Sequence, residues 1–248
     1  MKDSLYIVIP AYNESENIES CVKKWHPIIE QIVKDGGSAS RLIVIDDGSK
    51  DTTYEILLRL TESYPYLIPV TKENGGHGAT VLYGYRMAID SGVDYVFQTD
   101  ADGQTNPDEF NEFWRLRYDY DAIIGNRVKR GDGITRKIVE NVVCLLLRMI
   151  FQIKVKDANA PFRLMKTSLV KKYIDWLPEK YNLPNIMFTT YFVYFHEKVR
   201  FVPISFGQRQ NGVNSINVKK IITIGWKAIG DFAKLRNDLN NEHKEYLE

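Results

Sequence analysis

Residues 5–14 read LYIVIPAYNE, an apolar run that ends at a proline and gives way to polar side chains. A short continuous apolar run without alternation is typical of a strand that is buried on both faces of a parallel sheet. Residues 13–17 then offer capping side chains ahead of a helix through Ile18, Val22 and either Ile28 or Ile29. The stretch therefore predicts a strand followed by a turn and a helix.

The same unit recurs along the first half of the chain. Apolar segments at 42–45, 68–70 and 95–97 each end in a polar or glycine-rich stretch, and helices are expected at 52–60 and up to residue 88. Four such units within about 100 residues imply right-handed crossovers and a mostly parallel α/β sheet with helices on both faces. Ligands of such sheets bind at the carboxyl ends of the strands, where these polar stretches fall.

The second half of the chain is less regular. Strands are expected at 122–124 and 199–204, a basic loop at 129–137, and apolar helices at 138–153 and 187–195. No repeat or low-complexity linker divides the chain, so we expect one main domain over residues 1–216. Residues 217–248 carry apolar side chains near helical spacing and are expected to form an amphipathic helical tail.

Composition excludes several classes of protein. With 33 Lys and Arg against 32 Asp and Glu, the net charge is +1, so no global field attracts nucleic acid. Cys21 and Cys144 stand far apart and in no metal-ligand spacing, which indicates two buried thiols rather than a disulfide framework or a zinc site. We find no signal-peptide pattern and no apolar run near the roughly 20 residues of a membrane span, and we expect a cytoplasmic protein.

The sharpest chemical signal is Asp100-Ala101-Asp102, which directly follows the fourth apolar segment and is joined by Gln104. Two carboxylates one residue apart at a strand end can bind a hard cation and leave room for water and phosphate oxygens. A Mg²⁺ or Mn²⁺ ion there would offset the charge that develops on a departing diphosphate. A solvated acidic turn is the commoner explanation of such a motif by itself, but its position and the neighbouring motifs favour a metal site.

The loops after the first two strands suit a nucleoside. The ring of Tyr12 can cover a base, and the carboxylates of Asp46 or Asp47 can accept hydrogen bonds from a base or a ribose. Asn13 and Asp51 can equally serve as helix caps, and both interpretations can hold together.

Other features suit anionic groups. Residues 74–78, Asn-Gly-Gly-His-Gly, let the backbone approach a ligand and precede a helix whose first N–H groups can face an anion. The spacing differs from the dinucleotide fingerprint, and His77 is expected to line the loop or bind phosphate rather than act as a base. Arg127 and Arg209 follow later strands and carry guanidinium groups that match phosphate oxygens, although most surface arginines have no such role.

Together these stretches resemble family 2 glycosyltransferases, and within them the branch similar to dolichol-phosphate mannose synthase, which loads a sugar onto a polyprenyl phosphate. The matching stretches occur in the family's order and cover about residues 5–216: 9–14, 45–51, 74–79, 99–104, 125–127, 157–163 and 209–215. The set is highly specific for the family and less so for the branch.

The resemblance implies a GT-A fold and a metal-dependent, inverting transfer from a nucleotide diphosphate sugar. It implies that the metal, Mg²⁺ or Mn²⁺, is held by Asp100, Asp102 and Gln104. The nucleotide sugar would be bound by Pro10, Tyr12, Glu14, Asp46, Asp47, Gly75, His77, Asp100, Ala101 and Asp102. Arg127 and Arg209 would face phosphates and complete the catalytic set with the two metal-binding aspartates.

The presence or absence of a catalytic base indicates whether the acceptor is a sugar hydroxyl or a phosphate. Members that use sugar hydroxyls carry a Glu-Asp pair as the base, and no clear pair stands here, which favours a polyprenyl phosphate that is already ionised. Two alternatives remain. The enzyme extends a polysaccharide at a sugar hydroxyl, with Asp157 or Glu179 as the base, or the chain is a non-catalytic nucleotide-sugar-binding protein, against which the intact metal ligands argue.

Three departures from the family pattern accompany the resemblance. His77 stands where related loops often carry lysine, Gly103 replaces a larger apolar residue, and we expect no counterpart of the membrane-spanning tail of many relatives. The lysine-bearing tail and residues 138–153 suit a membrane interface and a peripheral membrane association. Packing against the sheet or against a second copy in a homo-oligomer is the alternative.

Overall fold

The computed structural model describes residues 2–131 and 134–208. The predicted tail, the expected domain boundary at residue 216 and Arg209 all lie outside the described residues. The elements in chain order are β1 (Leu5–Ala11), α1 (Ile18–Lys34), β2 (Arg41–Asp46), α2 (Thr53–Leu60), β3 (Leu67–Thr71), α3 (His77–Ser91), β4 (Tyr95–Gln98), the 3-10 turn η1 (Pro107–Glu109), α4 (Phe110–Leu116), β5 (Ala122–Arg130), α5 (Ile134–Phe151), β6 (Arg163–Lys166), α6 (Thr167–Ile174), α7 (Pro184–Tyr194) and β7 (Val199–Phe206).

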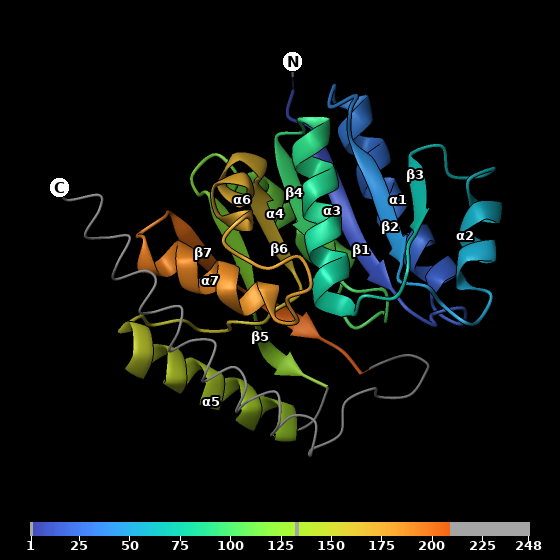
Figure 1. The fold of residues 1–248 in the computed structure, drawn as a ribbon. Coiled ribbons are helices and arrows are strands. Elements are labelled where there is room, and N and C mark those ends of the chain that lie inside the picture. The colour runs from blue at the N-terminus through green and yellow to red at the C-terminus, as the bar shows by residue number, and fades with distance from the viewer. Residues whose placement is uncertain (1, 132–133, 209–248) are drawn as a thin grey trace.

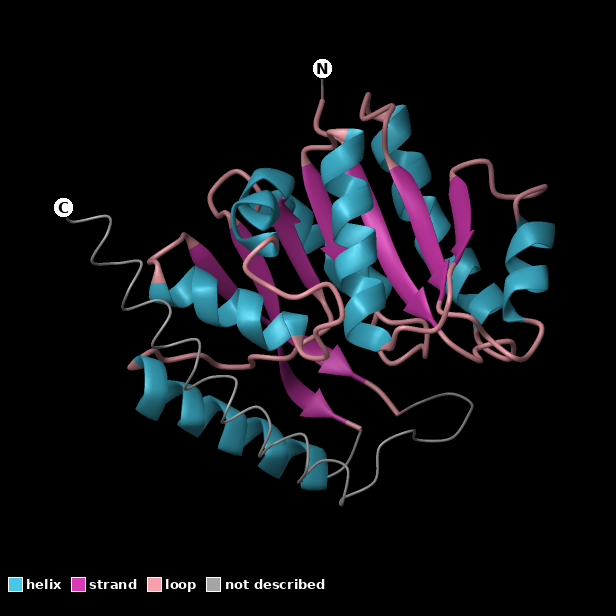
Figure 2. Cartoon of the chain, viewed as in Figure 1, coloured by secondary structure: helices cyan, strands magenta, loops and turns pink. Residues whose placement is uncertain are grey.

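One sheet organises the chain, with the strands in the order β3-β2-β1-β4-β6-β5-β7 (Figure 1). The pairs β3 with β2, β2 with β1, β1 with β4, and β5 with β7 are parallel. Strand β6 runs antiparallel to both of its neighbours, β4 and β5. Helices cover both faces (Figure 2), so the expected mostly parallel α/β sheet is confirmed.

The sheet separates two apolar cores, which explains the unbroken apolar run of β1. Successive side chains of a strand point to opposite faces. Val8 therefore packs with the helices α3, α5, α6 and α7, while Ile7 and Ile9 pack with α1, α2 and α4. Every residue of β1 except Tyr6 is buried, so an alternation of apolar and polar side chains would not suit this strand.

Helix α3 lies unusually close to β1 because a glycine faces the strand. A Cβ atom at Gly84 would lie 2.3 Å from the Cγ1 atom of Val8, so no larger residue fits without a shift. This approach fixes the start of α3, and with it the glycine-rich loop, beside the carboxyl ends of the central strands.

Three expectations need correction. Strand β6 and helix α6 were not predicted, because β6 is only four residues long and begins and ends with a charged residue. The basic loop expected at 129–137 is largely taken up by the end of β5 and the start of α5 at Ile134. Cys21 is buried as expected, but Cys144 is only partly buried; both thiols are free.

In the described part of the chain, no helix is long and apolar enough to cross a bilayer.

Candidate active site

The carboxyl ends of β1, β2 and β4 meet at one edge of the sheet. The Asp47 N–H donates to the Ala11 carbonyl at 2.8 Å, and the Thr99 N–H donates to the Val8 carbonyl at 3.2 Å. The loops that carry Tyr12, Asp47 and Asp100 therefore start side by side, as the order of the strands requires.

Asp47 is buried and holds the glycine-rich loop in place. Its carboxylate accepts the N–H groups of Gly75 at 2.9 Å and Gly76 at 2.8 Å, and it pairs with the ammonium group of Lys72. Burial raises the pKa of Asp47, but the hydrogen bonds from Lys72 and Gly75 outweigh it, so the pKa lies below its ordinary value. Asp47 is therefore an anion that determines the shape of the loop.

Asp46 and Asp51 are also engaged with the loops around the site. The buried carboxylate of Asp46 accepts the hydroxyl of Thr71 at 2.8 Å and the N–H of Ser49 at 3.2 Å. Asp51 accepts the N–H of Thr53 at the start of α2, at 3.0 Å. The contacts of Asp46 and Asp47 with a nucleoside stay predictions, and the structure adds their role in building the loops.

The loop after β1 presents one exposed ring. Tyr12 is 43% exposed, so its face is accessible to a flat ligand. Glu14 is buried and accepts the side-chain amide of Asn17 at 2.7 Å, while its carbonyl receives the N–H of Ile18 at 2.8 Å. Glu14 therefore fixes the turn from β1 into α1.

The glycine-rich loop lies against the predicted metal ligands. Gly76 has a φ of 87°, which favours glycine, and α3 begins at the next residue. His77 is half exposed, and its Nε2 atom lies 3.8 Å from Oδ1 of Asp100. A Cβ at Gly78 would lie 2.1 Å from the carbonyl oxygen of Tyr181, so the segment before α7 covers this loop. Nothing in the local sequence predicts that the segment around Tyr181 packs over Gly78.

Asp100 is oriented by a buried residue that sequence reasoning missed. The Nε2 atom of Gln98 donates to Oδ1 of Asp100 at 3.2 Å, and Gln98 is fully buried at the end of β4. The Tyr85 hydroxyl donates to the other end of the Gln98 amide at 3.5 Å. The sequence did carry a signal of this role: the apolar residues 95–97 are followed by the amide Gln98, although a fourth apolar residue is expected in a buried strand.

The donor set fits an ion that arrives together with a diphosphate. In the residues that the structure covers, no three His, Cys, Asp or Glu side chains gather as a metal site. Asp100 and Asp102 offer hard oxygen donors, and Mg²⁺ commonly binds one or two carboxylates while phosphates and water supply the remaining ligands. The Oδ1 atom of Asp102 also accepts the Gln104 N–H at 3.1 Å, which closes the turn.

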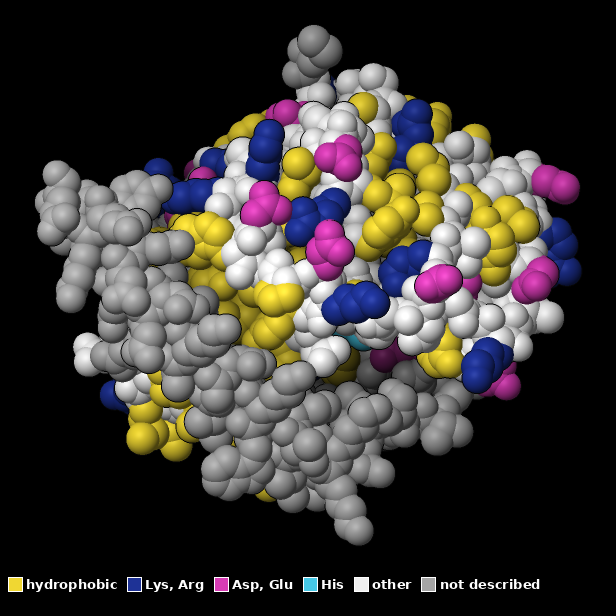
Figure 3. Space-filling view, in the orientation of Figure 1, with side chains coloured by type: hydrophobic (Ala, Val, Ile, Leu, Met, Phe, Trp, Pro, Cys, Tyr) yellow, Lys and Arg dark blue, Asp and Glu magenta, His cyan; other side chains and the backbone are white. Residues whose placement is uncertain are grey.

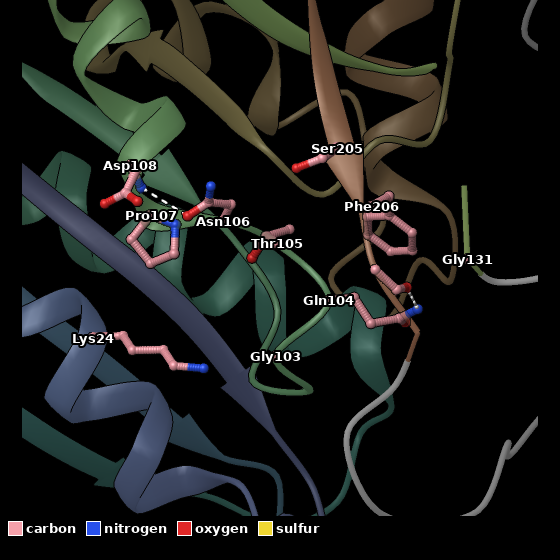
Figure 4. A pocket seen from close by; sticks show the side chains of 11 residues that line it. Lys24, Gly103, Gln104, Thr105, Asn106, Pro107, Asp108, Gly131, Ser205 and Phe206 are labelled. Atoms are coloured by element: carbon pink, nitrogen blue, oxygen red, sulfur yellow. Dashed lines mark hydrogen bonds between the residues drawn. The ribbon is translucent and has the colours of Figure 1, made fainter. Parts of the chain in front are cut away.

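Gln104 links this turn to the end of β7. Its Nε2 atom donates to the carbonyl of Gly207 at 2.8 Å, and the Gly207 N–H donates to the Gln104 carbonyl at 2.7 Å (Figure 4). Its metal-binding role stays a prediction, and only its side-chain oxygen is suited to it. A cavity of about 720 Å³ lies beside the turn, lined by Lys24, Gly103, Gln104, Thr105, Asn106, Pro107, Asp108, Gly131, Ser205, Phe206 and Gly207.

Arg127 is buried in an ion network rather than exposed to solvent. Its Nε and Nη2 atoms contact the two oxygens of Asp157 at 2.7 and 2.8 Å, and Nη2 lies 3.1 Å from Oε2 of Glu140. Asp157, one of the two candidate bases, thus faces a cation with both oxygens, and the other, Glu179, is exposed before α7. Arg163 is fully buried and donates to the carbonyls of Ala160 and Asn185. The phosphate contact of Arg127 stays a prediction.

Comparison with known proteins finds relatives among polyprenyl-phosphate glycosyltransferases. The UDP-N-acetylglucosamine–dolichyl-phosphate N-acetylglucosaminyltransferase of Methanococcus voltae is 26% identical over 201 residues, 73% of this chain and 76% of that protein. The undecaprenyl-phosphate 4-deoxy-4-formamido-L-arabinose transferase of Pectobacterium carotovorum is 23% identical over 222 residues, and the match spans 88% of this chain but only 64% of that relative.

Solved structures show the same fold. Glucosyl-3-phosphoglycerate synthase from Mycobacterium tuberculosis, crystallised with Mn²⁺, UDP and glucosyl-3-phosphoglycerate, superposes with a TM-score of 0.60 at 19% identity. The superposition covers 85% of this chain and 73% of that chain, and it assigns the GT-A fold that the resemblance implied. The sequence profile of Glycosyl transferase family 2 matches residues 6–175, more than half of the chain. The chain therefore belongs to glycosyl transferase family 2 and is a glycosyltransferase.

Proposed function

We propose that this glycosyltransferase moves a sugar from a nucleotide diphosphate donor to a polyprenyl phosphate, with inversion at the anomeric carbon. The observation that carries the proposal is the placement of Asp100 beside the glycine-rich loop, 3.8 Å from His77. Carboxylates and helix N–H groups then converge where a diphosphate would lie. The names of the two relatives, which refer to dolichyl and undecaprenyl phosphate, support this acceptor class.

A phosphate acceptor suits a site in which Asp157, one of the two candidate bases, is already paired. An oxygen of the acceptor phosphate attacks the anomeric carbon, the bond from that carbon to the donor diphosphate breaks, and the nucleoside diphosphate leaves with the electron pair. No proton has to be removed, so Asp157 can remain paired with Arg127. An enzyme that uses a sugar hydroxyl would need a free carboxylate instead.

Asp100 and Asp102 would hold a Mg²⁺ or Mn²⁺ ion, whose charge would stabilise the departing diphosphate. The residues of the chain prepare this arrangement. Gln98 orients Asp100 from behind, and Asp47 fixes the loop that leads into α3 by accepting the N–H groups of Gly75 and Gly76. Such preorganisation lowers the cost of assembling charges when the substrate binds.

The outer face of α5 suits peripheral binding to the cytoplasmic face of a membrane. Each of the apolar residues on this face is at least half exposed, and they recur at helical spacing: Ile138, Val142, Leu145 and Met149. Lys137 and Arg148 are exposed on one flank of this stripe. An apolar stripe with flanking cations fits the boundary between acyl chains and anionic headgroups. Figure 3 also shows apolar side chains over α7, but residues 184–192 of that helix are buried, so the exposed stripe belongs to α5.

The test uses the full chain with undecaprenyl phosphate, Mn²⁺ and a panel of UDP- and GDP-linked sugars. A lipid-linked monosaccharide is expected, and Asp102→Ala should abolish its formation. Asp119→Ala, in the exposed turn after α4, is the matched control and should leave it unchanged. No transfer from any donor would contradict the proposal, and transfer to a glycan hydroxyl alone would establish the polysaccharide alternative.

A further inference from the structure

Glu140 is a buried carboxylate on the inner face of α5, and the proposed transfer assigns it no role. Its Oε1 atom accepts the Ala158 N–H at 2.7 Å and the Cys144 thiol at 3.5 Å, while its Oε2 atom contacts Nη2 of Arg127. Burial, together with the nearby charge of Asp157, raises the pKa of Glu140 above its ordinary value. The side chain thus joins α5 to β5 and to the segment before β6.

Arg127 is held from three directions. Asp157 binds one edge of the guanidinium group through two hydrogen bonds and also accepts the Arg127 backbone N–H at 3.2 Å. The Phe206 ring of β7 lies against the group, with its centre 5.1 Å from Cζ. Glu140 approaches from α5 and contacts Nη2 at 3.1 Å. The orientation of the guanidinium group is therefore set by β7, by α5 and by the segment before β6.

Neutralising Arg127 does not require Glu140. The bidentate pair with Asp157 already balances the charge of Arg127, and burying a second carboxylate costs desolvation free energy. Arg163 brings a second cation close by, but it donates to carbonyls and to Thr189. The carboxylate of Glu140 is therefore not needed to balance the charge of Arg127. Its main effect is to restrict the direction of the Nη2 group.

We propose that Glu140 is a positioning residue, which from α5 fixes the Arg127 guanidinium in the orientation that serves the acceptor phosphate. The proposal rests on the proposed function, because it takes the phosphate contact predicted for Arg127 to be with the polyprenyl phosphate acceptor of that transfer. Its structural half, the restraint of Arg127 by Glu140, holds whatever the acceptor is.

The key variant is Glu140→Gln, which keeps the shape but has one oxygen acceptor. That oxygen can accept either the Ala158 N–H or the Arg127 Nη2 proton in the present geometry, but not both. The matched control is Glu109→Gln, a partly buried carboxylate that also accepts a backbone N–H, that of Ser205 at 3.0 Å, and that does not contact Arg127 in any hydrogen bond or ion pair described above. Glu140→Asp, whose carboxylate is drawn back by one methylene, is measured beside it, because the oxygen in Glu140→Gln can stay on Arg127.

Two readouts separate this proposal from the proposed function. Steady-state kinetics with undecaprenyl phosphate should show the KM for the acceptor rising about tenfold in Glu140→Gln, the loss expected for one charge-assisted hydrogen bond, with the KM for the donor unchanged. NMR of the arginine side chains should show faster rotation of the Arg127 guanidinium about its Cζ–Nε bond. Arg127→Lys identifies the signal, and Glu109→Gln should change neither readout.

Unchanged guanidinium rotation in both Glu140→Gln and Glu140→Asp overturns the proposal, whether or not the wild-type chain transfers a sugar. Faster rotation with an unchanged KM for the acceptor overturns the other half of the proposal, that the orientation of Arg127 serves the acceptor phosphate. Equal losses for donor and acceptor, together with a lower Tm, would show a merely structural role and would overturn it as well. If the wild-type chain transfers to no polyprenyl phosphate, the proposed function fails, and the NMR result still decides whether Glu140 restrains Arg127.

Discussion

Replacing Asp47 by asparagine tests whether a single buried carboxylate holds the glycine-rich loop. The substitution keeps the size of the side chain but removes the charge that faces Lys72. It also leaves one oxygen acceptor where two oxygens now receive the N–H groups of Gly75 and Gly76. One glycine N–H must then face the new amide NH₂ group, which cannot accept a hydrogen bond.

The expected cost follows from the burial of both partners. The side chain of Asp47 is 4% exposed and that of Lys72 is 17% exposed, so solvent screens the pair weakly. Breaking a buried pair by removing one partner costs about 3–5 kcal/mol. Lys72 keeps a hydrogen bond to the Glu73 carbonyl at 2.9 Å, which places the expected loss near the lower end, about 3 kcal/mol. That is a large share of the stability of an ordinary domain.

Urea unfolding of the wild type and of Asp47→Asn measures this loss directly. Calorimetry with UDP and Mn²⁺ should show weaker binding at temperatures where the variant is still folded. The double variant Asp47→Asn/Lys72→Met should recover part of the stability, because it also removes the unpaired ammonium group. A loss of stability below about 1 kcal/mol would refute the role assigned to Asp47.

Three further predictions follow from the geometry. Gly78→Ala puts a methyl group 2.1 Å from the Tyr181 carbonyl oxygen, so the covering segment must move; urea unfolding should show a loss of about 1–3 kcal/mol, and an unchanged midpoint would count against this packing. Gln98→Leu should keep the fold but raise several-fold the Mn²⁺ concentration needed for UDP binding, since Asp100 loses its orienting amide; an identical Mn²⁺ titration would exclude that role. Burial lowers the pKa of His26 below its unfolded value of 6.5, so its contribution to stability is present above pH 6.5 and is lost as pH falls through the folded pKa. Unfolding free energies measured from pH 7.5 down to pH 5 should therefore fall more steeply for the wild type than for His26→Phe.

The central strands and the edge that carries the site were predictable from local sequence. Strand β1 is buried on both faces, and such burial demands an unbroken apolar run. Polar residues are then tolerated only where these strands end, so the sequence alone assigns Tyr12, Asp47 and Asp100 to one edge of the sheet. Strand β6 escaped prediction because Arg163 and Lys166 frame only two apolar residues.

Parts of the site were decided by contacts between residues far apart in the chain. Arg127 meets Asp157, 30 positions later, and Glu140 approaches the same guanidinium from α5. The cover of Gly78 by Tyr181 joins segments that are still farther apart. None of these pairs leaves a periodic or spaced pattern that local reasoning could detect.

The sequence by itself determined the class of fold and the edge of the sheet where the chemistry lies, because apolar periodicity and strand-end polarity are local properties of the chain. Only the tertiary structure decided which charges pair with each other. Asp47 is committed to Lys72 and Arg127 to Asp157 because the fold brings them together in buried surroundings, where a charge must find a partner.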